Sequence, residues 1–105
     1  MPALKGFHRK YLRSQAHHLD PVVMIGKNGL ASSVLEKIDT SLNDHELIKI
    51  RFLDYNRDAI QTMCVEIAEK TSSEFCGKIG HVGIFYRQQD DPEKRKIILP
   101  KHSSL

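Results

Sequence analysis

The sequence lacks the features that mark membrane proteins, disulfide-rich proteins and stacking platforms. Its 105 residues include no tryptophan, only 7% aromatic residues and two cysteines. No apolar run approaches the ~20 residues needed to cross a bilayer. The basic start MPALKGFHRK has no apolar signal core behind it. These absences predict a single cytoplasmic domain without an obvious aromatic surface for stacking ligands.

The cysteines and histidines do not indicate a metal or redox site. Cys64 and Cys76 are not in a C-x-x-C pair, and one falls on a helical face while the other falls in a strand-like run. We therefore expect free, buried thiols rather than a disulfide or metal ligands. His17 and His18 are adjacent, so they point in different directions on a helix and make a poor chelating pair. No metal and no cofactor is predicted.

The sequence also lacks a recognisable catalytic pattern. No acid is paired with a base, and no nucleophile has an evident partner. The glycine-bracketed segment 26–29 is shorter than a Walker loop, which needs Gly-x4-Gly-Lys-Ser/Thr, and it is not a G-x-G-x-x-G dinucleotide turn. Asp20, Asp54 and Asp58 are well placed as turn and cap residues. We therefore expect a protein that is not an enzyme.

The most informative stretch present is PVVMIGKNGLASSVL, residues 21–35. Its apolar run 22–25 has the length of a buried strand. From Val34 onward the apolar residues recur at helical spacing, and either Ser32 or Ser33 is expected to cap that helix, Ser33 within a capping box. The segment therefore predicts a strand, a short glycine loop and a helix start.

The loop has the composition of a phosphate-binding turn. Gly26 and Gly29 can adopt positive φ and lack a Cβ, so a ligand backbone can approach the main chain closely. The first N–H groups of the following helix attract anions. Lys27 and Asn28 lie at the tip and offer one cation and one amide. The alternative is an ordinary strand-to-helix turn with a surface lysine.

The same G-x-x-G spacing occurs twice more, at residues 77–80 and 80–83, without a helical pattern after it. These copies fall among β-type residues. We interpret Gly77 as an irregularity within a strand and Gly80 with His81 as a tight hairpin turn. Spacing alone therefore does not identify a binding loop, and the strand-to-helix context of the first copy distinguishes it.

Positive charge is concentrated near the start of the chain. The formal net charge is +3, but residues 1–30 alone carry +4 because five basic residues meet only Asp20. The five are Lys5, Arg9, Lys10, Arg13 and Lys27. Such asymmetry favours an anionic partner at one end of the molecule, most commonly nucleic acid. A merely solvated basic helix face is the alternative.

The remaining patterns predict a compact α/β domain, with a small four-stranded mixed sheet and helices in the order α-β-α-β-α-β-β. Beyond the segment already described, we expect a basic amphipathic helix at about 4–18, a strand at 46–53, a helix at 57–71, strands at 74–79 and 82–87, a solvated loop at 88–96, and a short strand or apolar clamp at 97–99. The domain should span residues 1–100, with a frayed tail at 101–105.

Several blocks of the sequence, in one order, resemble the CRM domain family. They are Arg9-x-x-Leu12-Arg13 followed by Ala16-His17-x-Leu19-x-Pro21-Val22-Val23, then Ile25-Gly26-Lys27-Asn28-Gly29-Leu30, His45-Glu46-Leu47-Ile48-Lys49-Ile50, Ile79-Gly80 leading to Tyr86-Arg87, and Ile97-x-Leu99-Pro100. The family occurs alone in small YhbY-type bacterial ribosome-assembly proteins and in tandem in organellar group II intron splicing factors of plants. The likeness runs from about Arg9 to Pro100.

This resemblance implies a fold like the C-terminal domain of translation initiation factor three. It also implies RNA binding through the G-x-x-G loop in the manner of a KH domain, and association with precursors of the large ribosomal subunit. The chain departs from the family pattern at Ala31, where a hydroxyl residue is common, at His81, where a cation or apolar residue is more usual, and after Arg87, where no proline follows. None of these departures lies within the loop.

Together, the residues and the resemblance predict a monomeric RNA-binding protein of pre-ribosomal particles. The loop main chain of Gly26 and Gly29 and the helix dipole would hold phosphates, Lys27 would neutralise charge, and Asn28 would contact sugar or phosphate. The basic helix, with Lys5, Arg9, Lys10 and Arg13, would extend the track from the same end of the domain. Lys49 and Arg51 are weaker candidates, because cations on a strand face are usually solvated. The alternative function is a protein-interaction module that docks on an acidic ribosomal or assembly-factor surface.

Overall fold

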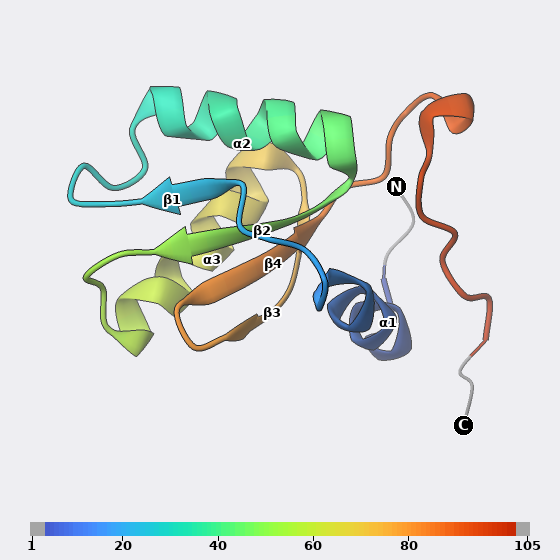
Figure 1. The fold of residues 1–105 in the computed structure, drawn as a ribbon, viewed down its shortest axis with the longest axis horizontal. Helices are drawn as coiled ribbons and strands as arrows, with labels where there is room; N and C mark the ends of the chain where they lie inside the picture. Colours follow the sequence, from blue (N-terminus) through green and yellow to red (C-terminus); the bar gives the residue numbers. More distant parts are fainter. Residues whose placement is uncertain (1–3, 103–105) are drawn as a thin grey trace.

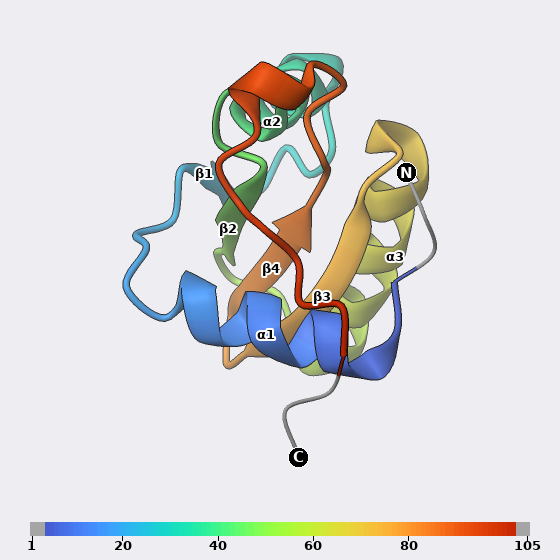
Figure 2. The ribbon, with the colours of Figure 1, turned by 90° about the vertical axis from the view of Figure 1, so that its right-hand side faces the viewer.

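The computed structural model describes residues 4–102 and contains a four-stranded mixed sheet with helices on both faces (Figures 1 and 2). The elements are α1 (Gly6–Ala16), β1 (Val23–Ile25), α2 (Ser32–His45), β2 (Leu47–Phe52), α3 (Arg57–Thr71), β3 (Glu74–Ile79), β4 (Val82–Tyr86) and a single 3-10 turn, η1 (Pro92–Lys94). The predicted element order and mixed sheet are confirmed. The predicted domain limits at residues 1–3 and the tail residues 103–105 lie outside the described residues.

The sheet topology gathers three connections at one edge of the molecule. The strand order is β1-β2-β4-β3, with β1 parallel to β2 and the other pairs antiparallel. The parallel pair ends where the glycine loop and the β2–α3 connection begin. The β3–β4 hairpin turns at the same edge, since the register pairs Arg51 with Val82 and Val82 with Ile79. This shared edge, at the left of Figure 1, carries the predicted loop.

Each face of the sheet carries its own apolar cluster. The face under α2 and α3 buries Ile48, Ile50 and Phe52 of β2 together with Phe85 of β4. The opposite face, under α1, buries a second cluster, which we call the α1-side cluster. It consists of Leu4 before α1 and of residues of α1, β2, β3 and β4, namely Leu12, Ala16, Leu47, Cys76, Ile84 and Tyr86. Successive side chains of β2 and β4 thus alternate between the two faces, with Phe85 on the opposite face from Ile84 and Tyr86.

The strand before the loop is an edge strand rather than the predicted buried one. Val23 and Ile25 are buried, but Met24 is 60% exposed and Val22 36% exposed. β1 pairs only with β2, and its other side chains project onto the sheet face that α1 covers elsewhere. A short apolar run is found both in central buried strands and in edge strands, so the sequence pattern could not distinguish the two.

The helix after the loop also differs from its prediction at both ends. α2 begins at Ser32 with Ala31 at its N-cap, and no side chain caps it, so the predicted cap at Ser32 or Ser33 is wrong. The helix runs on to His45, although Asn43, Asp44 and His45 interrupt the helical spacing of its apolar residues. At the other end of the chain, helix α1 is shorter than the predicted 4–18.

The chain after β4 is tied to the sheet by Glu46, a residue predicted to lie in a strand. Glu46 is 1% exposed and has φ of 64°, which turns the chain between α2 and β2. Its Oε1 accepts backbone hydrogen bonds from Lys96 (2.6 Å) and Ile97 (3.1 Å), and its Oε2 accepts one from Gln89 (2.8 Å). The segment 88–96 is therefore anchored rather than simply solvated. Ile97 and Leu99 pack on the α1-side cluster, which confirms the predicted clamp without a strand.

We predict that Glu46→Gln destabilises the fold. The amide replaces one accepting oxygen with an NH₂ group that faces a backbone N–H donor, and it removes the charge that strengthens the remaining bonds. Urea denaturation should show a loss of about 2 kcal/mol in the free energy of unfolding. Glu93→Gln, at an exposed carboxylate of η1, is the matched control and should change stability little. Equal stabilities of the two variants would contradict this role of Glu46.

The predicted state of the cysteines is confirmed, because Cys64 and Cys76 are free and buried on opposite faces of the sheet. Burial is the main cause that raises the pKa of each thiol from 9.0 to about 12. The negative charge of Glu74 raises the pKa of Cys76 further. Both side chains are therefore held as neutral thiols at physiological pH.

We predict that neither thiol reacts with Ellman's reagent in the folded protein at pH 8. With a pKa of about 12, only about one thiol in ten thousand is ionised there. Both should react readily in concentrated urea. Since the unfolded chain releases these protons near pH 9 and the folded chain holds them, the free energy of unfolding should fall as pH rises from about 9 toward 12. Rapid labelling of the native protein would refute the assignment.

Candidate nucleic-acid interface

The glycine loop is a tight four-residue turn. The Gly29 N–H donates to the Gly26 carbonyl over 3.0 Å, and Lys27 and Asn28 are exposed at the tip, as predicted. Gly29 has φ of 61°, whereas Gly26 does not have positive φ, so the predicted left-handed backbone occurs at one glycine of the two. A Cβ on Gly26 would meet no atom within 4 Å, which leaves its main chain open to a ligand.

Tyr55 supports this turn from the β2–α3 connection, a role that the sequence analysis missed. Its hydroxyl donates to the Gly26 carbonyl over 2.6 Å. The backbone N–H of Leu53 donates to the Ile25 carbonyl over 2.9 Å, which joins the two connections just before the loop. The only signal in the sequence is one aromatic residue in a turn, and nothing in the spacing links Tyr55 to a loop 29 residues earlier.

Helices α2 and α3 both begin at this edge, and they differ in whether a side chain accepts hydrogen bonds from their first backbone N–H groups. At α3, the Asn56 side chain accepts from the Ala59 N–H over 2.8 Å, and Asp58 supplies a negative charge in the first turn. At α2, no side chain caps the helix and no acidic residue lies in the first turn. The first N–H groups of a helix have no intrahelical acceptor, so α2 leaves its N-terminus available to an external anion. This end of α2 directly follows the glycine loop.

The arginines of α1 are largely occupied by the fold. Arg13 donates to the Cys76 carbonyl over 2.7 Å, and Arg9 donates to the Leu4 carbonyl over 3.0 Å. The Arg13 side chain also lies over Gly77, where an added Cβ would come within 2.9 Å of Arg13 Cδ. Gly77 has φ of 138° and lies at a register shift of β3, which confirms the predicted strand irregularity.

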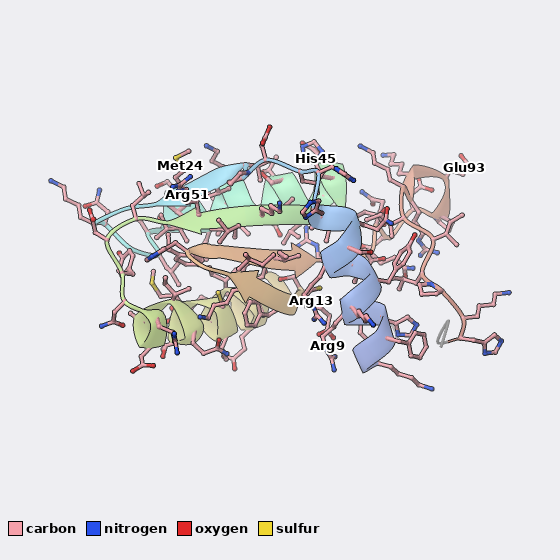
Figure 3. The ribbon with its side chains drawn as sticks, turned by 60° about the horizontal axis from the view of Figure 1, so that its bottom comes forward. Arg9, Arg13, Met24, His45, Arg51 and Glu93 are labelled. Carbon is pink, nitrogen blue, oxygen red and sulfur yellow. The ribbon has the colours of Figure 1, made fainter. Side chains whose placement is uncertain are left out.

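The expected proximity of α1 to the glycine loop is wrong. Figures 1 and 2 show α1 across the sheet toward the opposite end of the molecule from the loop. Lys5 and Lys10 are exposed on or beside this helix, and Figure 3 shows Arg9 and Arg13 along it. We expected these cations to lie near Lys27 because they are close to it in the chain. The α1–β1 connection instead leads away from α1, so that β1 ends at the opposite end of the molecule.

The two cations of β2 differ from each other. Lys49 is half-buried, and its ammonium group donates to the Leu19 carbonyl over 2.9 Å and to the His17 carbonyl over 3.5 Å. The Arg51 side chain is exposed and makes no hydrogen bond or ion pair with any residue in the range 4–102. The same is true of Lys27. Of the predicted binding cations, Lys27 and Arg51 are therefore the two at this edge whose side chains are left unpaired within residues 4–102.

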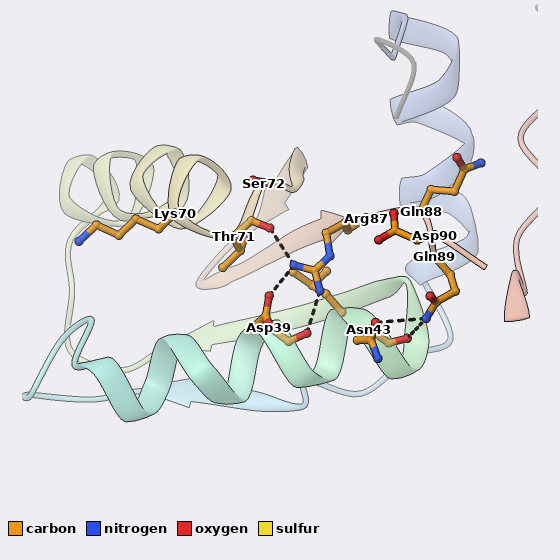
Figure 4. Close-up of a pocket in the computed structure, with 10 residues that line it drawn as sticks. Asp39, Asn43, Lys70, Thr71, Ser72, Arg87, Gln88, Gln89 and Asp90 are labelled. Atoms are coloured by element: carbon orange, nitrogen blue, oxygen red, sulfur yellow. Dashed lines mark hydrogen bonds and ion pairs between the residues drawn. The ribbon is translucent and has the colours of Figure 1, made fainter. Parts of the chain in front are cut away.

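The hollows of the surface do not coincide with the loop. One of about 420 Å³ lies between the ends of α2 and α3, with Arg87 in its wall (Figure 4). The Arg87 guanidinium donates to Asp39 Oδ1 (2.6 Å), to the Asp39 carbonyl (3.0 Å) and to the Thr71 carbonyl (2.8 Å). These bonds tie the two helices together, so the arginine has a structural role there.

Within residues 4–102, no three His, Cys, Asp or Glu side chains are grouped so as to hold a metal ion. None of the helices in that range is long and apolar enough to span a bilayer.

Comparison with known proteins gives consistent results. The sequence model of the CRS1/YhbY (CRM) domain matches residues 4–87. A protein of Haemophilus influenzae named "RNA-binding protein" is 39% identical over 96% of this chain and 99% of its own length. The Bacillus subtilis "Probable RNA-binding protein YqeI" is 29% identical over 92% of this chain and 99% of its own. The solution structure of a Staphylococcus aureus protein, described as a candidate RNA binder, has a TM-score of 0.80 at 35% identity and covers 93% of this chain and 100% of its own.

We predict that Tyr55→Phe loosens the glycine loop without changing the fold. The variant keeps the ring and loses only the hydrogen bond to the Gly26 carbonyl, so the free energy of unfolding should fall by about 1 kcal/mol. Backbone ¹⁵N relaxation should show lower order parameters for residues 27–29 than in the wild type. Tyr11→Phe removes a half-buried hydroxyl on α1 and is the control. Unchanged loop order would show that the Tyr55 bond does not hold the turn.

Proposed function

Because this chain belongs to the CRS1/YhbY (CRM) domain family, whose model spans residues 4–87, we propose that it is a non-enzymatic RNA-binding protein that holds phosphates at the glycine loop. The observation that carries the proposal is the uncapped, acid-free N-terminus of α2 beside an exposed turn. The names of its relatives in Haemophilus influenzae and Bacillus subtilis support RNA as the ligand.

Recognition at the loop is mainly of the RNA backbone. A phosphate accepts hydrogen bonds from the first N–H groups of α2, and the helix dipole favours its negative charge. Lys27, which has no partner in the described chain, neutralises a phosphate, and Asn28 contacts a sugar or phosphate oxygen. Tyr55 fixes the loop in advance, so less order has to be gained on binding.

The basic helix contributes at a distance. Lys5 and Lys10 are exposed and attract phosphates of an RNA long enough to reach α1 from the loop. Arg9 and Arg13 have lesser roles in binding, because each donates a guanidinium hydrogen bond to the fold. A structured RNA that spans both ends of the domain therefore suits the charge distribution better than a short one.

The cellular role that we propose is assistance to ribosome assembly in the cytoplasm, through association with precursors of the large ribosomal subunit. It rests on family membership and on the phosphate contacts proposed above for the glycine loop of a monomer. Sucrose-gradient sedimentation of extracts tests it, with the tagged protein expected in precursor large-subunit fractions and RNase treatment expected to release it. Sedimentation at the top of the gradient under all growth conditions would contradict this role.

We predict that Gly29→Asp weakens binding of a structured RNA by at least about tenfold. The substitution puts a carboxylate beside the proposed phosphate and strains a backbone with φ of 61°. Gly80→Ala is the control for strain, because Gly80 has φ of 58° and an added Cβ would meet no atom within 4 Å. Ser72→Asp, at an exposed residue with φ of 52°, is the control for charge. If folded Gly29→Asp binds like the wild type, the loop is not the site.

We predict that Lys27→Ala weakens all RNAs by similar factors, of the order of 1 kcal/mol, because it removes one phosphate contact. A salt series should show a log–log slope that is shallower by about 0.7 to 0.9. Lys94→Ala, at an exposed lysine of η1, is the matched control and should leave the slope unchanged. Wild-type binding to ribosomal particles that survives both RNase and high salt would instead favour a protein-docking function.

A further inference from the structure

One part of the sheet is left without a covering element. Met24 is 60% exposed and Ile79 63% exposed, and between them lie the exposed Arg51 and the half-buried Val82. The register pairs Met24 with Arg51, Arg51 with Val82, and Val82 with Ile79. These four side chains form one row across all four strands, which we call the open strip.

All four side chains of the open strip point to the face on which α1 lies. Met24 alternates with Val23 and Ile25, and Arg51 alternates with Ile50 and Phe52, all of which are buried under α2 and α3. The α1-side cluster covers the other end of this face, together with Ile97 and Leu99. Figure 3 shows Met24 and Arg51 side by side, away from the labelled arginines of α1.

The strip combines apolar surface with one unused cation. Single exposed apolar residues need no explanation. Here Ile79 pairs with Val82, and the aliphatic stem of Arg51 lies between Val82 and Met24, so the row offers one continuous apolar surface of the kind that marks an interaction site. Arg51 lies within the patch and has no partner in the range 4–102. The strip contains no carboxylate, and the nearest acidic residues in the chain lie in flanking connections, at Asp20 and Asp54. Its chemistry therefore suits a flat, apolar and anionic ligand.

The strip is also adjacent to the proposed phosphate site. Met24 precedes Gly26 by two residues, which is about 7 Å along a strand. The row spans three interstrand spacings, or about 14 Å, a width comparable to the sheets on which RNA-recognition domains stack two or three bases. Because α2 begins on the other face of the sheet, an RNA held at the glycine loop would reach the strip by passing around the edge strand β1.

We propose that the open strip binds the unstacked bases of a single-stranded RNA segment, with the bases lying on Met24, Val82 and Ile79 and the Arg51 guanidinium stacked on a base face. This inference rests on the proposed function of the glycine loop and adds a second contact of a different kind. Duplex RNA hides its base faces within the stack, so it contacts the loop but gains nothing from the strip. The protein thus prefers single-stranded segments next to the phosphate that the loop holds.

The test uses the double variant Met24→Thr/Ile79→Thr, which removes apolar surface, keeps the net charge and places β-favouring residues on exposed strand positions. Its affinity for a single-stranded RNA of about ten nucleotides should fall by about tenfold with an unchanged salt slope. Its affinity for a duplex of the same length should stay unchanged. An abasic oligonucleotide, which has the same phosphates, should bind the wild type and the double variant equally. In the wild type, the Met24 and Ile79 methyl resonances should move upfield on addition of single-stranded RNA, because base ring currents shield them.

The matched control is Val65→Thr/Ile98→Thr, which changes two other exposed apolar residues, on α3 and after η1, and should bind like the wild type. Gly29→Asp in the same assays separates the two proposals. If Gly29→Asp loses RNA while Met24→Thr/Ile79→Thr binds single strands like the wild type, the strip is not an RNA surface and the loop proposal stands. In that case the strip is a protein-docking surface. If the wild type binds no RNA, both proposals fail.

Discussion

The hydrogen bonds of the buried Glu46 carboxylate hold together the end of the molecule that lies opposite the glycine loop. The Glu46 backbone N–H donates to the Leu42 carbonyl and its carbonyl accepts from the Arg87 N–H, each over 2.8 Å, so the end of α2, the start of β2 and the end of β4 meet at this residue. Its side chain then draws residues 89–97 toward the α1-side cluster. A buried charge is tolerable there because backbone donors surround it. The chain closes this end with its own segments, which leaves the opposite edge open to a ligand.

The sequence predicted most elements because their patterns are local. The alternation in β2, the limits of α3, the positive φ of Gly80 and the irregularity at Gly77 all follow from side-chain period or turn chemistry. What it could not predict depends on contacts between distant segments. Met24 looked buried because nothing in its neighbourhood says that α1 stops short of β1. Glu46 was predicted to continue the strand because its real role is not visible locally. The three backbone N–H groups that donate to its carboxylate lie 43 to 51 positions later in the chain.

The candidate site shows the same division. The loop residues Lys27, Asn28 and Gly29 have the exposure and turn geometry expected from their spacing. The cations were harder to predict, because a count of lysines and arginines does not reveal which ones the fold uses. Arg13 and Lys49 donate to main-chain carbonyls, whereas Lys27 and Arg51 have no partner in the described chain. Every residue has a main-chain carbonyl, and that carbonyl carries no formal charge. A search of the sequence for oppositely charged side chains therefore could not have revealed these bonds.

The parallel pairing of β1 with β2 explains why two unlike surfaces meet at one edge. It places the glycine loop, which leads into α2, directly after the strand that carries Met24 of the open strip, although the start of α2 presents N–H dipoles and the strip presents methyl groups. Salt screens phosphate contacts strongly and apolar contacts with bases hardly at all. Together the two surfaces would keep part of the affinity at cellular ionic strength, while the loop alone would lose most of it. Phosphate contacts fix position and carry no sequence information, and aliphatic surfaces accept any base face. Under the two proposals together, the domain would recognise where RNA is unpaired rather than which sequence it has.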